Sequence, residues 1–150
     1  MERTERVTLT NMCMIQDGSR VLVQDKVSGD WPGTTFPGGH VEKGESFTNA
    51  VIREVLEETG LAIARPRLVG IKNWSNDDDS RYMVLLYKTS SFTGELRSSD
   101  EGEVYWIEMD DLYEMPLAYD MQDLLKVFMD DDLSEFQYYQ EDGVWKYHMK

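Results

Sequence analysis

The sequence is poor in cysteine, in histidine and in long apolar runs, and each shortage excludes a class of protein. A single cysteine, Cys13, rules out an internal disulfide and a multi-cysteine zinc site. The two histidines, His40 and His148, stand alone and lack the paired spacing of a zinc site. No apolar run approaches the ~20 residues of a membrane helix, and the charged start lacks the apolar stretch of a signal peptide. We therefore expect a cytoplasmic protein.

Basic residues are also scarce. The 150 residues contain 29 acidic side chains against 15 Lys and Arg, for a net charge of -14. Residues 100–150 hold fifteen of the acids and only three bases, and the simplest reading of this segment is a solvated face. Such a charge repels nucleic-acid phosphates and anionic lipid heads, so we expect no long nucleic-acid partner and no membrane surface. Any phosphate compound that binds here needs divalent cations to cancel the repulsion.

The length and the 41% hydrophobic content fit one domain with a real core, spanning residues 1–150. Residues 7–16 and 20–26 are predicted to form a β-hairpin through the turn at Asp17-Gly18-Ser19. The remaining elements are predicted as a loop at 27–39, helices at 46–59, 110–115 and 120–130, strands at 67–74, 81–92 and 103–109, and a hairpin at 137–149. Because no regular βαβ units occur, we expect an α/β protein with a mixed sheet and helices on both faces.

Three carboxylates share one face of the helix predicted at 46–59. Glu54, Glu57 and Glu58 are spaced i, i+3 and i+4, so they fall within a sector of roughly 100°. They repel one another, and the only base in this helix is Arg53, to one side. A cluster of hard divalent cations is the simplest compensation, because Mg²⁺ prefers carboxylate oxygen. A merely solvated helix face is the alternative.

The ends of this helix are well marked. Ser46 is a good N-cap, and Gly60 suits the left-handed position that follows a helix. The opposite side carries an apolar stripe that we expect to face the core. Its members are Thr48, Ile52, Val55, Leu56 and Thr59.

The segment ahead of the helix, Phe36-Pro37-Gly38-Gly39, is a loop in which no side chain blocks close approach to the backbone. Such a loop can offer a main-chain carbonyl to a metal, or its amides to a phosphate. Gly38 and Gly39 are therefore candidate binding residues.

Residues 39–61 match the pattern Gly-x5-Glu-x7-Arg-Glu-U-x-Glu-Glu-x-Gly-U, in which U is aliphatic, at every fixed position. The matching residues are Gly39, Glu45, Arg53, Glu54, Val55, Glu57, Glu58, Gly60 and Leu61. A chance match in a chain of this length is on the order of one in a million. The pattern resembles the Nudix box, and the order of elements around it resembles the Nudix fold over the whole chain. The resemblance implies an α/β/α sandwich.

The resemblance also implies a hydrolase that uses Mg²⁺ or Mn²⁺ and cleaves a nucleoside diphosphate linked to another group. By position, Glu54, Glu57 and Glu58 become metal ligands. Arg53 and Glu45 become the pair that orients them.

Two further metal ligands are expected outside the helix. The resemblance makes the backbone carbonyl of Gly38 one of them. We hypothesise that Glu101, in the acidic segment before the strand at 103–109, faces the metals as the general base or as an extra ligand. An ordinary acidic loop is the alternative reading of this segment.

Outside the box, the chain looks most like the MutT-type 8-oxo-dGTP diphosphatases. The likeness rests on three stretches: Arg20-Val21-Leu22-Val23 with Lys26, Ser99-Asp100-Glu101 with Trp106, and the tail from Leu133 onward. Two positions depart from that group, because Tyr119 stands where a second acid is expected and Leu117 replaces a tryptophan.

By position, Asn11 and Asp120 match residues that read the purine in that group. An amide or a carboxyl can hydrogen-bond a purine edge, and a shielded carboxyl could stay protonated and donate. Lys26 could reach a phosphate. The alternatives are a polar group at the rim for Asn11, a helix cap for Asp120 and an ordinary exposed lysine for Lys26. Three aromatic residues could stack a base, and packing is the alternative for each: Trp31, Phe36 and Tyr119.

The leading interpretation is a metal-dependent pyrophosphohydrolase that converts oxidised purine nucleoside triphosphates, such as 8-oxo-dGTP, to the monophosphate and pyrophosphate. The alternatives are a Nudix hydrolase for a dinucleoside polyphosphate, a nucleotide sugar or capped RNA, and a non-catalytic nucleotide sensor. A homodimer is left open by the resemblance, and the sequence locates no interface.

Overall fold

The computed structural model describes residues 1–27, 29 and 32–150. Its main sheet contains β1 (Val7–Asp17), β2 (Arg20–Lys26), β3 (Gly33–Thr35), β5 (Arg67–Ser75), β6 (Arg81–Thr89), β8 (Gly102–Glu108), β9 (Glu135–Glu141) and β10 (Val144–Met149). Two short strands, β4 (Leu61–Ala64) and β7 (Ser91–Gly94), pair separately. The helices are α1 (Phe47–Thr59), the 3-10 helix η1 (Met109–Glu114) and α2 (Met121–Met129).

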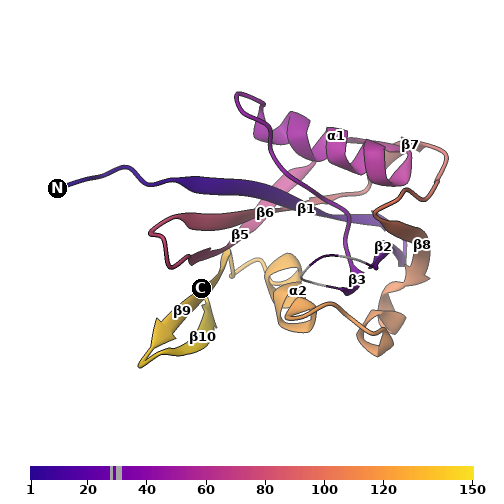
Figure 1. Cartoon of the computed structure of the whole chain (residues 1–150). Coiled ribbons are helices and arrows are strands. Elements are labelled where there is room, and N and C mark those ends of the chain that lie inside the picture. The colour runs from indigo at the N-terminus through magenta and orange to yellow at the C-terminus, as the bar shows by residue number, and fades with distance from the viewer. Residues whose placement is uncertain (28, 30–31) are drawn as a thin grey trace.

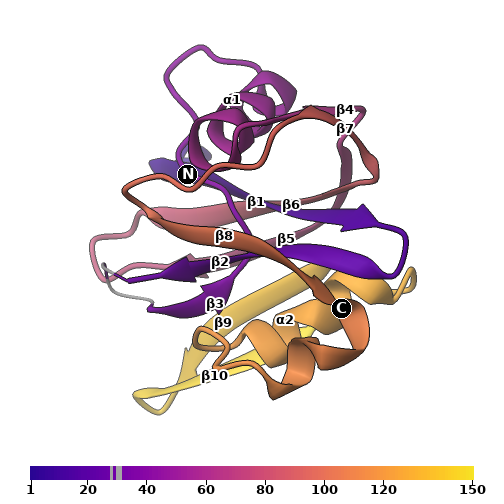
Figure 2. The ribbon, with the colours of Figure 1, turned by 90° about the vertical axis from the view of Figure 1, so that its right-hand side faces the viewer.

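The main sheet is mixed, and α1 and α2 cover its opposite faces (Figures 1 and 2). Its order is β10-β9-β5-β6-β1-β2-β3, and β8 pairs along β2. The β1–β6 and β5–β9 pairs are parallel, whereas the other pairs are antiparallel. The predicted α/β architecture with a mixed sheet and helices on both faces is confirmed.

The β1–β2 hairpin exists only beside its turn. Two residue pairs join the strands there. Further along, β2 pairs with β3 instead of β1, while β6 pairs with β1 and β8 pairs with β2. The glycine loop fills the opening that this divergence leaves. The amide of Asn11 donates to the carbonyl of Gly39 at 2.8 Å, and that of Cys13 donates to the carbonyl of Pro37 at 2.9 Å. The separation of β1 and β2 therefore brings the loop into the plane of the sheet.

Three short strands were not predicted from the sequence. β3 lies inside the predicted loop at 27–39, and the predicted strand at 81–92 is divided at Ser90 into β6 and β7. β4 follows directly after Gly60. Strands of three or four residues hold too few alternating positions for a periodic pattern to show.

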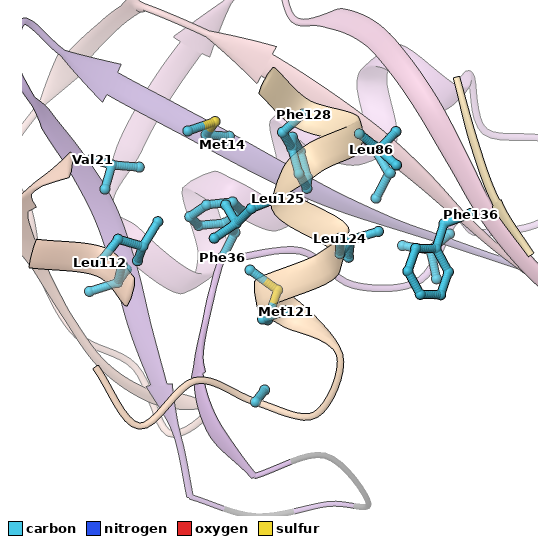
Figure 3. Close-up of a cluster of buried hydrophobic side chains, with 14 residues drawn as sticks. Met14, Val21, Phe36, Leu86, Leu112, Met121, Leu124, Leu125, Phe128 and Phe136 are labelled. Atoms are coloured by element: carbon cyan, nitrogen blue, oxygen red, sulfur yellow. The ribbon is translucent and has the colours of Figure 1, made fainter. Parts of the chain in front are cut away.

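Alternate residues of β1 enter two separate cores. Cys13 and Ile15 pack on the α1 side with Val51 and Val55, whereas Met14 packs on the α2 side. Figure 3 shows the second core, where α2 turns its apolar residues toward the sheet. In this core the rings of Phe36 and Phe128 meet edge to face, with centroids 5.2 Å apart. Alternate residues of β1 therefore pack on opposite faces of the sheet.

Both predicted ends of α1 are confirmed. The Ser46 side chain accepts a hydrogen bond from the Asn49 amide, and Gly60 is left-handed with a φ of 78°. The predicted apolar stripe is partly wrong, because Leu56 and Thr48 are exposed. The side that faces the sheet instead carries Ala50, Val51, Val55, Glu58 and Thr59. The helix is thus rotated so that one carboxylate, Glu58, lies against the sheet and the glycine loop.

Candidate functional site

A cavity of about 350 Å³ lies beside the glycine loop. At one end, which we call the acidic end, it is lined by Gln24, Gly38, Gly39, Glu54, Glu58 and Glu101. At the other, which we call the aromatic end, it is lined by Lys72, Trp74, Tyr82, Tyr119 and Asp120. The acidic end receives its carboxylates from α1 and from the segment before β8. The aromatic end is built from β5, β6 and the start of α2.

Glu58 is the buried carboxylate of the acidic end, with 7% of its surface exposed. Its Oε2 accepts a hydrogen bond from the Gly38 amide at 3.1 Å. Burial raises the pKa of Glu58 to about 7, and the nearby charges of Glu54 and Glu101 act in the same direction, while the Gly38 amide opposes them. Among the described residues no cationic side chain pairs with Glu58. No basic side chain among these residues therefore competes with a bound cation for the Glu58 carboxylate.

Arg53 ties α1 to the loop in front of it. Its Nε and Nη2 donate to the two oxygens of Glu45 at 2.8 and 2.9 Å, and Nη2 also donates to the carbonyl of His40 at 2.9 Å. The bidentate contact holds the pKa of Glu45 at about 2 and raises that of Arg53. The predicted Arg53–Glu45 pair is thus formed, and it fixes the loop against the helix.

The same guanidinium divides the three helical carboxylates. Nη1 donates to Glu54 at 2.9 Å and lies 3.3 Å from Glu57. Glu54 lines the cavity, but Glu57 is exposed and does not. Within the described part of the chain, no three acidic, histidine or cysteine side chains are gathered closely enough to hold a metal. Glu54 and Glu57 pair with Arg53, whereas Glu58 accepts a hydrogen bond from Gly38. The three carboxylates are therefore close to one another but do not point at one common position.

The donor set at this end nevertheless fits a hard divalent cation, which takes carboxylate and carbonyl oxygens. The loop backbone lies directly against these carboxylates. A Cβ on Gly39 would lie 2.2 Å from Oε2 of Glu54, and one on Gly38 would lie 2.1 Å from the carbonyl oxygen of Asn11. At Gly38 only glycine fits, because the contact is with the backbone of β1, whereas a side chain at Gly39 would displace the Glu54 carboxylate. The residues of the cavity wall that could hold the cation are Gly38, Glu54, Glu58 and Glu101. Glu57, which pairs with Arg53 outside the wall, could join them only by turning toward the cavity.

Asn11 lies at the acidic end. Its Oδ1 accepts a hydrogen bond from the Gly39 amide at 3.0 Å, and it has the same parity on β1 as Cys13 and Ile15, which face α1. Its Nδ2 is buried and has no hydrogen-bond partner in the described part of the protein. The side chain thus orders the loop, and it keeps one donor unused.

Gln24 is a site residue that the sequence reasoning missed. It lines the cavity from β2, is 3% exposed, and its buried Nε2 has no hydrogen-bond partner among the described residues. Lys26, two positions further along β2, lines the same cavity. A polar residue at an inward position of an apolar strand is the signal that could have identified Gln24.

Asp120 lines the aromatic end, as a purine-reading residue would, but it is held by partners that the sequence did not reveal. Lys72 Nζ lies 2.7 Å from its Oδ2, and the hydroxyl of Tyr138 donates to the same oxygen at 2.6 Å. Its backbone is left-handed, with a φ of 63°, and its side chain caps no helix amide. The capping alternative is therefore wrong. Oδ2 of Asp120 is thus already used by two partners, from β5 and β9.

The aromatic residues considered for stacking separate in the structure. Both Phe36 and Tyr119 line the cavity, but Phe36 is buried against α2 whereas Tyr119 is 66% exposed. Trp31 lies outside the described residues. Two rings that the sequence did not single out, Trp74 and Tyr82, stack on each other with centroids 4.6 Å apart.

A model of the NUDIX domain matches residues 6–129. This chain belongs to the Nudix family. The Nudix hydrolase YvcI of Bacillus subtilis, whose activity its description leaves open, is 34% identical over 123 residues, which cover 79% of this chain and 75% of that protein.

Two other curated relatives carry named activities. An ADP-ribose pyrophosphatase of Methanocaldococcus jannaschii is 29% identical over 119 residues, covering 77% of this chain and 69% of its own. An oxidized purine nucleoside triphosphate hydrolase of Danio rerio is 30% identical over 106 residues, which cover 68% of this chain and 66% of that protein.

Among solved structures, the mutator MutT protein of Bacillus halodurans superposes on this Nudix chain with a TM-score of 0.77 and 30% identity. The match covers 95% of this chain and 97% of that one. The described helices include none of the length and apolar character needed to cross a membrane.

Proposed function

We propose that this Nudix chain is a Mg²⁺- or Mn²⁺-dependent pyrophosphohydrolase that converts oxidised purine nucleoside triphosphates, such as 8-oxo-dGTP, to the monophosphate and pyrophosphate. The observation that carries the proposal is the single cavity with two unlike ends. Carboxylates and a glycine loop suit a polyphosphate with its cations, while aromatic rings and a donor–acceptor pair suit a base. We place the reaction in the cytoplasm, on free nucleotides rather than long nucleic acid.

The acidic end holds the cations in this proposal. Oxygens of Glu54, Glu57 and Glu58 and the carbonyl of Gly38 bind them. When bound, they neutralise the polyphosphate and make a coordinated water more acidic. Arg53 and Glu45 keep the loop and the helix in register.

Glu101 takes the proton of the attacking water in this proposal. It lies across the cavity from α1, close enough for its charge to raise the pKa of Glu58. Lys26, Gly39 and the Nδ2 of Asn11 offer donors to the substrate.

The aromatic end reads the base. Lys72 offers N–H donors beside the acceptor oxygens of Asp120, with Nζ and Oδ2 2.7 Å apart. This pair complements a lactam edge, where a carbonyl adjoins an N–H. Guanine and 8-oxoguanine carry such an edge, whereas adenine has its donor and acceptor in the reverse order, so in the same pose both would face the wrong partner. The zebrafish relative that hydrolyses oxidized purine nucleoside triphosphates supports the same substrate class.

A second candidate substrate is a nucleoside diphosphate joined to a sugar, because the archaeal relative is an ADP-ribose pyrophosphatase. A panel of 8-oxo-dGTP, dGTP, dATP, ADP-ribose and a dinucleoside tetraphosphate, assayed with Mg²⁺ and resolved by anion-exchange chromatography, separates the two. We expect the highest kcat/KM for 8-oxo-dGTP, with pyrophosphate as product. If ADP-ribose is preferred, it becomes the assigned substrate. If none of the compounds is hydrolysed, the enzymatic proposal fails and a non-catalytic nucleotide sensor is the alternative that stands.

A further inference from the structure

Gln24 lies at the acidic end because side chains along β2 alternate between the two faces of the sheet. Leu22 packs in the α1 core whereas Val21 and Val23 pack in the α2 core, so Gln24 lies on the α1 face. On β3 it pairs with Thr35, the last residue of the strand before the glycine loop. The Gln24 side chain thus lies where α1 and this loop meet.

The Nε2 group of Gln24 is a buried donor without a hydrogen bond among the described residues. Leaving such a group unsatisfied costs about 1–3 kcal/mol, and buried polar groups in native proteins are rarely left so. Replacing it by an apolar side chain of similar shape would remove that penalty. Its presence therefore points to a partner in a working state of the site.

Glu58 is the acceptor that Gln24 faces. Gln24 is among the groups that lower the pKa of Glu58, against the burial that raises it. Among the described residues the Gly38 amide makes the one fully formed hydrogen bond to the Glu58 carboxylate. The Gln24 carboxamide is near enough to lower the pKa of Glu58 as a donor, but its Nε2 completes no hydrogen bond, and a carboxylate has about four acceptor sites. A donor on β2 and an unsaturated acceptor on α1 thus lie next to each other.

The four glutamates at fixed positions of the box are supported in two different ways. Glu45, Glu54 and Glu57 pair with the charged Arg53. Glu58 is approached by neutral groups, the Gly38 amide and the Gln24 carboxamide. A neutral donor orients a carboxylate without cancelling the negative charge that a cation needs. In metal sites such outer partners fix the ligand and increase its affinity.

We propose that Gln24 is a positioning residue, whose Nε2 donates a hydrogen bond to the Glu58 carboxylate when the acidic end is loaded with a divalent cation. The inference rests on the proposed function, because it gives Glu58 the role of a cation ligand. Gln24 itself touches neither the cation nor the substrate.

The test compares Gln24→Met with the wild type by electron paramagnetic resonance, which counts free Mn²⁺ during a titration without nucleotide. We expect Mn²⁺ to bind about 10–100-fold more weakly to the variant. Urea unfolding of the metal-free protein should be unchanged or shifted to higher urea, because the unsatisfied donor is gone. Gln140→Met, at an exposed position of β9, is the matched control and should change neither measurement.

A second comparison uses the Glu58→Gln background. There Gln24→Met should have no further effect on Mn²⁺ affinity, because the acceptor that it serves is already altered. Unchanged affinity in Gln24→Met, or a loss of metal-free stability large enough to explain weaker binding, would overturn the inference alone. A wild type that binds no Mn²⁺ would overturn the proposed function together with it.

Discussion

The two ends of the cavity differ in how they deal with buried charge. At the acidic end, Glu58 is buried among other carboxylates, and burial holds its pKa near 7. At the aromatic end, Asp120 is buried to a similar degree but is neutralised by Lys72 at 2.7 Å. The acidic end therefore has an uncompensated negative charge, whereas the aromatic end is internally balanced. An exogenous cation is needed only at the first.

The ends also differ in how the chain builds them. Apart from Glu101 and residues on β1 and β2, the acidic end comes from one continuous segment, residues 38–58, held by Arg53. The aromatic end combines side chains from β5, β6 and the start of α2, and Tyr138 of β9 supports it. Groups that would serve the reaction are thus local in the sequence, while groups that would select the base are assembled by the fold.

The largest expected effect is on turnover at the acidic end. Glu58→Gln should lower kcat by about 10³-fold or more, because it removes the buried charge that we assign to cation binding. Circular dichroism should show an intact fold. Glu114→Gln, on an exposed residue of η1, is the control. A variant that retains near-normal rates would contradict the metal-ligand role.

Lys72→Met should have its largest effect on stability. It leaves Asp120 buried without its cation, which costs roughly 3–5 kcal/mol when one partner of a buried pair is lost. Adding Asp120→Asn should recover part of that free energy of unfolding, measured in urea. In both variants the preference for guanine over adenine nucleotides in kcat/KM should fall by about 10-fold or more. An unchanged preference would reduce Lys72 to a purely structural role.

Glu101→Gln should reduce kcat by about 10²-fold, the usual contribution of a general base. The substitution is conservative and the residue is exposed, so the melting temperature should not change. If turnover is unaffected, Glu101 is neither the base nor a needed ligand, and the acidic end is confined to α1 and the loop.

The smallest effect concerns the pH dependence of the metal-free protein. Because the pKa of Glu58 is raised in the folded state, the folded protein holds this proton more tightly than the unfolded chain. Its contribution to stability is therefore present below pH 4.5 and is lost as the pH rises through about 7. In EDTA, Glu58→Gln should gain roughly 1–3 kcal/mol relative to the wild type between pH 5 and pH 8. If urea titrations of the wild type and Glu58→Gln show the same pH dependence, burial does not raise the pKa of Glu58.

The sequence anticipated the acidic end better than the aromatic end, for a physical reason. Helical spacing places Glu54 and Glu58 on one side of α1, and the capping residues Ser46 and Gly60 define the ends of α1 without reference to the rest of the fold. The partners of Asp120 lie 48 and 18 residues away, on β5 and β9. Only tertiary structure brings them together.

Errors of the sequence prediction have the same origin. Leu56 looks like a core residue on a helical wheel, yet it is exposed because Glu58 occupies the side that faces the sheet. Gln24 looks like one polar residue in an apolar strand until the strand order places it beside Glu58. In both cases the missing information was the rotation of α1 relative to β2.

The central claim is that the acidic end binds divalent cations together with a polyphosphate. A crystal grown with Mn²⁺ and a non-hydrolysable purine triphosphate analogue tests it directly through the anomalous signal of manganese. We expect an anomalous peak about 2.0–2.6 Å from oxygens of Glu54 or Glu58, with the triphosphate beside it and the base near Lys72. Manganese peaks only at other sites, or a triphosphate bound away from these glutamates, would contradict it.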